Sequence, residues 1–145
     1  LVDISALSGL TQLTSLDLRG CKLLVDITVL SGLNQLTSLN LRNCGEITNL
    51  DPLLKLTNLK ELTWITNSVC AEILLNGAIS RLDSDYIMKN LKEWIHYFSL
   101  VKRESFFIGL LKGIELLNER EYQTKFLTHL VEKSFHQHYQ LHKIL

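Results

Sequence analysis

The 145-residue chain has little of what several classes of protein require. One proline and seven glycines exclude a collagen-like or low-complexity chain, and three cysteines are too few for a disulfide scaffold. No apolar run approaches the roughly 18–20 residues that span a bilayer. Neither sign of charge is in excess, because 15 Lys and Arg balance 15 Asp and Glu. This neutrality argues against nucleic acid and membrane surfaces as partners.

Leucine, by contrast, is abundant, and its positions are periodic. The chain contains 32 leucines, many of which recur at one fixed interval, as Leu16, Leu39 and Leu62 do. Residues 2–24 and 25–47 are identical at 15 of 23 aligned positions, and a third copy, 48–70, keeps the apolar positions. A fixed period of this length with this leucine spacing indicates an array of structural repeats.

Each repeat combines two spacings of apolar residues. In the second copy, Leu39 and Leu41 flank Asn40, which is the two-residue period of a short strand. Before the strand the leucines are three residues apart, as at Leu30 and Leu33, which favours a tight return in 3₁₀ or extended turns. The strand is therefore expected to place its leucines inside and its polar residues outside.

This pattern, LxxLxLxxC/N with further leucines or isoleucines every third residue, covers residues 1–67. It resembles the leucine-rich repeat family, most closely its internalin-like and SDS22-like branch. The resemblance implies a curved solenoid with parallel strands on its concave face, used to bind proteins. The chain departs from many members by having cysteine at Cys21 and Cys44, where those members have asparagine. Because the first repeat begins within a unit, we expect the chain to be the C-terminal part of a longer protein.

The second half, residues 68–145, has the three-and-four spacing of amphipathic helices. Asn67 or Ser68 is expected to cap the first helix, and Asp83 or Ser84 the second. Two further helices are expected around 107–117 and 122–130. The predicted fold class is therefore an α/β repeat solenoid, residues 1–67, followed by an all-α helical C-terminal module, residues 68–145, that caps the array.

The outward positions of the predicted strands form the candidate binding site. Parallel strands lie about 4.8 Å apart, so Arg19 and Arg42 are expected side by side, where they need a shared anion or a carboxylate such as Asp17. One interpretation is a contact for an acidic group on a partner, and the other is a solvated polar face. Trp64 occupies the position in the third repeat that Leu41 occupies in the second, and it is expected to fill the core there. The predicted partner-binding residues are Ser15, Asp17, Arg19, Ser38, Asn40, Arg42, Glu61 and Thr63.

Other reactive residues do not form a recognisable site. The cysteines, at positions 21, 44 and 70, match no zinc or CxxC spacing and are expected to be buried free thiols, although stacked Cys21 and Cys44 could in principle form a disulfide. Cys70 is near a predicted helix N-terminus, which can lower a thiol pKa. His138 and His142, spaced i and i+4, could share a metal, but an exposed terminal helix also tolerates histidine. No catalytic motif is present, so no enzyme activity, cofactor or metal is predicted.

The sequence thus predicts a cytoplasmic protein-protein interaction module that binds a protein partner through the strand face. The helical module is expected to close the array and to provide a possible surface for homo-oligomers. The alternative is that the chain is the sensor or targeting region of a larger enzyme or immune-type switch, whose catalytic domain lies outside it. A third interpretation makes the helical module an effector in its own right.

Overall fold

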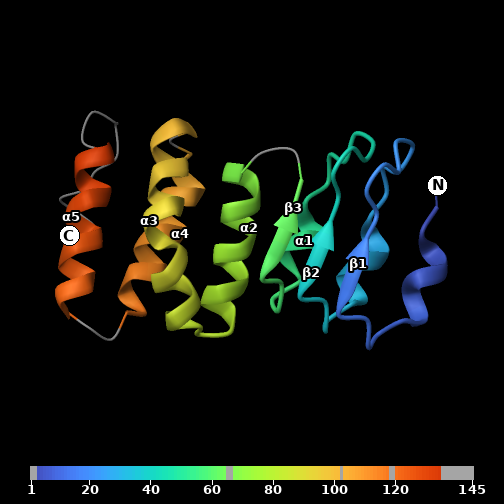
Figure 1. Cartoon of the computed structure of the whole chain (residues 1–145), viewed down its shortest axis with the longest axis horizontal. Coiled ribbons are helices and arrows are strands. Elements are labelled where there is room, and N and C mark those ends of the chain that lie inside the picture. Colours follow the sequence, from blue (N-terminus) through green and yellow to red (C-terminus); the bar gives the residue numbers. More distant parts are fainter. Residues whose placement is uncertain (1–2, 65–66, 102, 118–119, 135–145) are drawn as a thin grey trace.

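The computed structural model describes residues 3–64, 67–101, 103–117 and 120–134. The strands lie toward the N-terminal end of an elongated molecule, and four longer helices follow them along its axis (Figure 1). No helix among the described residues has the length and apolar character needed to cross a membrane. The elements are η1 (Ser5–Gly9), β1 (Ser15–Asp17), η2 (Thr28–Gly32), β2 (Ser38–Asn40), α1 (Asp51–Leu54), β3 (Glu61–Thr63), α2 (Asn67–Ser80), α3 (Ser84–Val101), α4 (Glu104–Glu115) and α5 (Arg120–Ser134).

The predicted fold class, an α/β repeat solenoid followed by an all-α helical module, is wrong. The described residues form five α-helices and a sheet of only three parallel strands, and they show no solenoid of repeats. Each strand is three residues long, whereas α2–α5 have 12 to 18 residues each. The period of the leucines therefore accounts for three short strands, and the three-and-four spacing accounts for most of the regular structure. The division at residues 67 and 68 stays a prediction.

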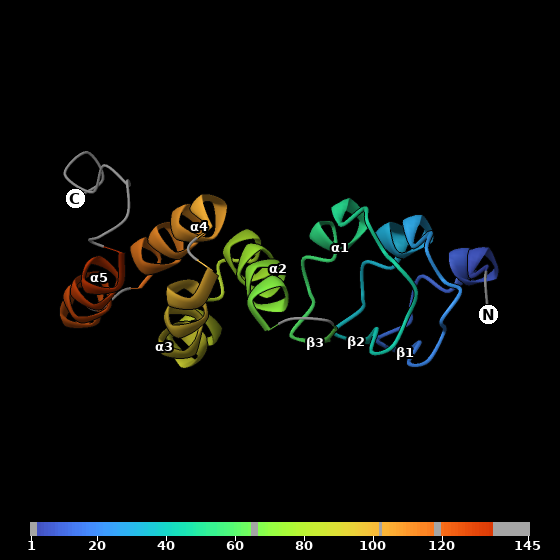
Figure 2. The same ribbon diagram turned by 90° about the horizontal axis from the view of Figure 1, so that it is seen from above.

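The sheet has the order β1-β2-β3, and its register follows the sequence period. Leu39 in the middle of β2 is opposite Leu16 in β1 and Leu62 in β3, which lie one period before and one period after it. Viewed from above, the strands form one side of this region, and η1, η2 and α1 form the other (Figure 2). Leu30 and Leu33 on the return side are completely buried in the same apolar cluster as Leu39. Burial of these leucines thus holds the two sides together.

The first turn of this region is less well buried than the second. Leu10 is 49% exposed, whereas Leu33, its equivalent one period later, is 0% exposed. Leu7 and Leu13 are half-buried, whereas their equivalents one period later, Leu30 and Leu36, are fully buried. The cause is geometric, because β2 has a strand on both sides, whereas β1 is at the edge of the described sheet.

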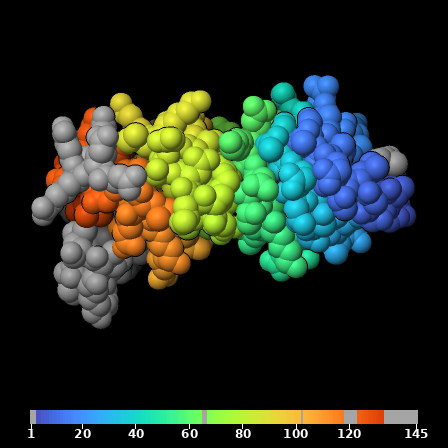
Figure 3. Space-filling view, turned by 90° about the horizontal axis from the view of Figure 1, so that it is seen from below, coloured from blue at the N-terminus to red at the C-terminus, as the bar shows by residue number. Residues whose placement is uncertain are grey.

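Helix α2 joins the sheet to the remaining helices. Its Ile73 packs in the apolar cluster of the sheet, and its Leu75 packs in a second cluster with Phe98 and Phe107. Glu72 on the same helix accepts hydrogen bonds from Arg103 Nε at 2.7 Å and from Ser105 Oγ at 2.6 Å. Helices α3 and α4 pack against α2, and α5 packs against α3 and α4. Figure 3 shows the result, in which successive parts of the chain follow one another along the long axis.

Two equivalent leucines provide a test of this packing. Leu39→Ala should reduce the free energy of unfolding by about 2–5 kcal/mol, because it removes a fully buried side chain between two strands. Leu16→Ala, the matched control at the half-buried edge position, should reduce it by less than half as much. Urea unfolding monitored by circular dichroism measures both values. Equal losses would contradict the difference in packing between β1 and β2.

Candidate functional site

The eight predicted partner-binding residues lie on and just after the three strands. Ser15, Ser38 and Glu61 are adjacent across the sheet, and Asp17, Asn40 and Thr63 form the neighbouring row. Ser38 and Asn40 are half-buried, and the other six predicted residues, including Arg19 and Arg42, are exposed. Ser38 Oγ donates a hydrogen bond to Glu61 Oε2 at 3.3 Å, which links the second and third strands on this surface. We call these eight residues the strand face.

Two of these residues shape the backbone that carries the arginines. Asp17 Oδ1 accepts a hydrogen bond from the backbone N–H of Arg19 at 2.9 Å, and Asn40 Oδ1 accepts one from Arg42 at 3.0 Å. These are Asx turns, in which the side chain stabilises the turn two residues later. Asp17 and Asn40, both predicted to contact a partner, therefore also make the same local turn at the ends of β1 and β2.

The two arginines differ in their electrostatic surroundings. Arg19 Nη2 lies 3.5 Å from Asp17 Oδ2, and both side chains are more than half exposed, so this ion pair is weak. In the second strand the equivalent of Asp17 is the neutral Asn40. Among the described residues, no carboxylate lies within ion-pair distance of Arg42. Of the two guanidinium groups on the strand face, Arg19 therefore has a carboxylate within ion-pair distance and Arg42 has none among the described residues.

A groove of about 390 Å³ adjoins the strand face at β3. Helix α3 lies on the same side of the molecule as the strands, while α2 is set back between them, so α2 forms the floor of the groove (Figure 2). Its walls come from β3 and α3. The lining residues are Lys60, Glu61, Leu62 and Thr63 from β3 and its approach, Asn67, Cys70, Ala71 and Leu74 from α2, and Tyr86, Asn90, Glu93, Trp94 and Tyr97 from α3.

Sequence reasoning missed the α3 wall of this groove. It used the apolar stripe of the helix, including Ile87 and Leu91, to predict burial, and both residues are fully buried. Four residues that line the groove, Tyr86, Asn90, Glu93 and Tyr97, are spaced by four, three and four and therefore lie along one face of the helix. This spacing can be read from the sequence. The position of β3 opposite this helix face cannot, because β3 and α3 are separated by α2 along the chain.

Hydrogen bonds hold the tyrosines of the α3 wall in place. Tyr86 Oη donates to the carbonyl oxygen of Lys60 at 2.7 Å, which ties α3 directly to the approach to β3. The Tyr86 and Trp94 rings also pack in a T-shaped arrangement, with centroids 5.7 Å apart. Tyr97 Oη donates to Glu93 Oε1 at 2.6 Å. Burial raises the pKa of Tyr86, and the hydrogen bond to Glu93 raises the pKa of Tyr97, because ionisation would remove the donated proton.

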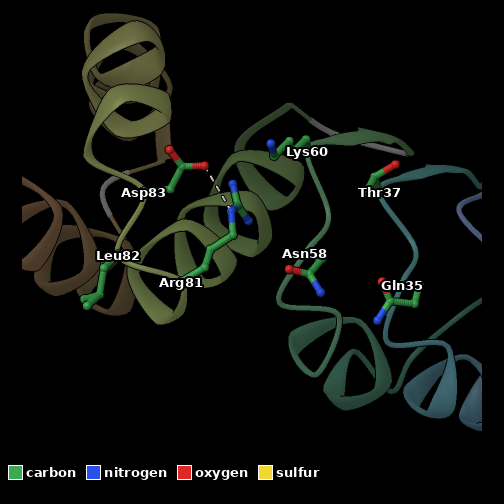
Figure 4. A pocket seen from close by; sticks show the side chains of 7 residues that line it. All are labelled: Gln35, Thr37, Asn58, Lys60, Arg81, Leu82 and Asp83. Carbon is green, nitrogen blue, oxygen red and sulfur yellow. Dashed lines mark hydrogen bonds and ion pairs between the residues drawn. The ribbon is translucent and has the colours of Figure 1, made fainter.

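A second hollow, of about 460 Å³, lies between the α2–α3 turn and the loops that precede β2 and β3 (Figure 4). Arg81, Leu82 and Asp83 line one side of this hollow, and the other side is lined by Gln35, Thr37, Asn58 and Lys60. Arg81 Nη1 donates to the carbonyl oxygens of Thr57 at 2.9 Å and Leu59 at 3.3 Å, and Nε donates to Asp83 Oδ2 at 3.1 Å. The guanidinium is therefore largely engaged in structural contacts.

Asp83, which Arg81 contacts, also begins the next helix. Its Oδ1 accepts a hydrogen bond from the backbone N–H of Tyr86 at 3.2 Å, as expected for an N-cap residue. This confirms one of the two caps predicted for the second helix. Although burial opposes ionisation, the hydrogen bonds from Tyr86 and Arg81 lower the pKa of Asp83. The Arg81–Asp83 pair thus fixes where α3 starts, and with it the position of the α3 wall.

The cysteines are free thiols in the structure. Cys70 is buried, and burial raises the pKa of its thiol, so the expectation of a lowered pKa at this helix N-terminus is wrong. Burial also raises the pKa of Cys44, which is half-buried and whose Sγ donates to the carbonyl oxygen of Leu18 at 3.1 Å. Raised pKa values disfavour the nucleophilic thiolate. Cys21 is half-buried as well.

The remaining predicted features can be placed only in part. Trp64 packs against the apolar cluster of the sheet, but it is only half-buried, whereas its equivalent Leu41 is fully buried, so the prediction that it fills the core holds only in part. His138 and His142 lie outside the described residues. Within the part of the chain that the structure describes, no group of three His, Cys, Asp or Glu side chains could hold a metal ion. Comparison of the chain with protein-family models, curated proteins and solved structures found no match.

The two groove tyrosines predict a pH dependence. Because their folded pKa values are raised, the folded state favours the neutral phenols, and this stabilisation is complete at pH values below the ordinary tyrosine pKa of about 10. It should be lost as the pH rises through the higher folded values. Spectrophotometric titration of tyrosinate should show two late-ionising groups, and Tyr86→Phe and Tyr97→Phe should each remove one of them. Unchanged late ionisation in both variants would contradict this assignment.

Proposed function

We propose that this chain is a protein-protein interaction module that binds its partner through the strand face. The observation that supports the proposal is the pair of Asx turns at Asp17 and Asn40, which present Arg19 and Arg42 from neighbouring strands on an exposed surface. Two guanidinium groups at strand spacing suit a carboxylate or another acidic group, which can accept hydrogen bonds from both. The expected partner is a protein with an acidic group at the contact.

The kind of function proposed rests on the amino-acid sequence. We propose that the chain binds a protein and has no enzyme activity, cofactor, nucleic-acid partner or membrane partner. The resemblance of the sequence to leucine-rich repeats favours protein recognition. The three free thiols support a reducing compartment such as the cytoplasm, since unpaired cysteines persist there. If the chain forms homo-oligomers, we propose that the helices make the contact, because the strand face is assigned to the partner.

Charge reversal on the strand face tests the proposal. Arg19→Glu combined with Arg42→Glu should weaken partner binding about 100-fold or more, because the acidic group of the partner would then be repelled by two carboxylates instead of being bound by two guanidinium groups. Affinity capture with the tagged chain, followed by quantification of the bound proteins by mass spectrometry, measures this loss. The circular dichroism spectrum should not change, since both side chains are exposed.

The matched control reverses two exposed lysines away from the strand face. Lys55→Glu combined with Lys112→Glu makes the same change in net charge, on the α1 side and on α4. This control should retain the captured protein. Equal capture by the strand-face variant and the control, at wild-type level, would rule out the strand face as the binding surface.

A further inference from the structure

We propose that the groove between β3 and α3 binds a basic side chain, arginine or lysine, of the protein partner. This inference rests on the proposed function, because it treats the groove as a continuation of the strand face. Glu61 and Thr63 belong to both surfaces, since they are strand-face residues and also form the β3 wall of the groove. A partner segment that crosses the three strands from β1 to β3 therefore arrives directly at the groove.

The charges around the groove favour a cation. Glu61 is on the β3 wall and Glu93 is on the α3 wall, and both side chains are exposed. Glu61 lines the groove and also accepts a hydrogen bond from Ser38 on β2, so its carboxylate lies between the strand face and the groove. Lys60 also lines the groove, and its positive charge is among the causes that lower the pKa of Asp83. The lining thus carries one carboxylate on each wall and a single lysine, which leaves an excess of negative charge.

Both carboxylates are oriented and still have room for a ligand. Glu61 Oε2 accepts one hydrogen bond, from Ser38, and Glu93 Oε1 accepts one, from Tyr97. An ionised carboxylate has about four acceptor positions, so each retains capacity for the N–H groups of an arginine or lysine. A guanidinium carries five N–H donors, which is enough for hydrogen bonds to two carboxylates.

The remaining surface of the groove suits the apolar stem of such a side chain. Leu74 on the floor and Tyr97 on the α3 wall are half-buried, so each presents part of its apolar surface. Long basic side chains commonly pack their methylene groups on such surfaces while the charged end remains polar. The Tyr86 ring, which lines the groove, already has a guanidinium over one of its faces, since Arg81 Cζ lies 5.0 Å from the ring centroid.

An NMR titration of the full chain tests the groove directly. The probe is the peptide acetyl-Gly-Arg-Gly-amide, with the lysine peptide as a second ligand and the citrulline peptide as an uncharged control of almost the same shape. The indole N–H resonance of Trp94, identified by its loss in Trp94→Phe, and the side-chain amide of Asn90 report on the groove. We expect both basic peptides to shift these resonances, with at least fivefold weaker binding of the citrulline peptide.

Charge-neutralising variants link the binding to the two carboxylates. Glu61→Gln and Glu93→Gln should each weaken binding of the arginine peptide at least fivefold, while glutamine keeps an oxygen that can accept the hydrogen bond of Ser38 or Tyr97. The matched control is Glu115→Gln, an exposed residue at the end of α4, which should bind as the wild type does. Well-dispersed amide spectra confirm that each variant is folded.

The outcomes separate this inference from the proposed function. Absence of groove shifts with the arginine peptide, or equal binding of the citrulline peptide, would overturn the groove proposal while leaving the strand-face test to stand alone. Equal shifts with calcium or magnesium ions alone would also overturn it, by assigning the carboxylates to a small cation. If the peptide binds as expected but Arg19→Glu/Arg42→Glu still captures the partner, the groove proposal stands and the strand face fails.

Discussion

Burial of leucines between the strands and the return segments is the interaction on which the rest of the structure depends. Leu39 from β2 and Leu30 and Leu33 from the opposite side are almost completely removed from water. This burial determines which residues of each strand point inward, because side chains alternate along a strand. Asp17 and Asn40 are then forced outward, where they close the Asx turns before Arg19 and Arg42. The arrangement of polar residues on the strand face is thus a consequence of how the leucines are buried beneath it.

Helix α2 transmits this order to the second half of the molecule. One of its residues, Ile73, is buried with the leucines of the sheet, and another, Leu75, is buried with the aromatic residues of α3 and α4. The helix therefore sets the separation between β3 and α3, and this separation creates the groove. Arg81 and Tyr86 reinforce the same geometry through hydrogen bonds to backbone carbonyls of the chain that leads into β3.

The sequence predicted local features well and long-range features only where the period applied. The fixed leucine period predicted that Ser38 would lie beside Glu61, and the spacing of Ile87 and Leu91 predicted a helix with that face buried. The solenoid did not follow, because the number and length of the strands depend on the whole packed structure and not on the period. The groove was not foreseen, since no periodic signal relates Glu61 to Glu93. The Asx turns at Asp17 and Asn40 were not foreseen, because in the sequence an Asp or Asn that closes such a turn cannot be told from one that is only exposed.

The unequal burial of equivalent leucines also determines how the molecule opens. Leu10 and Leu33 occupy equivalent positions, yet only Leu33 is removed from water, so the β1 edge contributes less stability than the sheet interior. Local unfolding proceeds first where few apolar contacts must be broken. Amide hydrogen exchange is therefore expected to be faster around η1 and β1 than in α2. Arg19 follows the less buried strand β1, whereas Glu61 and the groove adjoin α2, which packs in both apolar clusters.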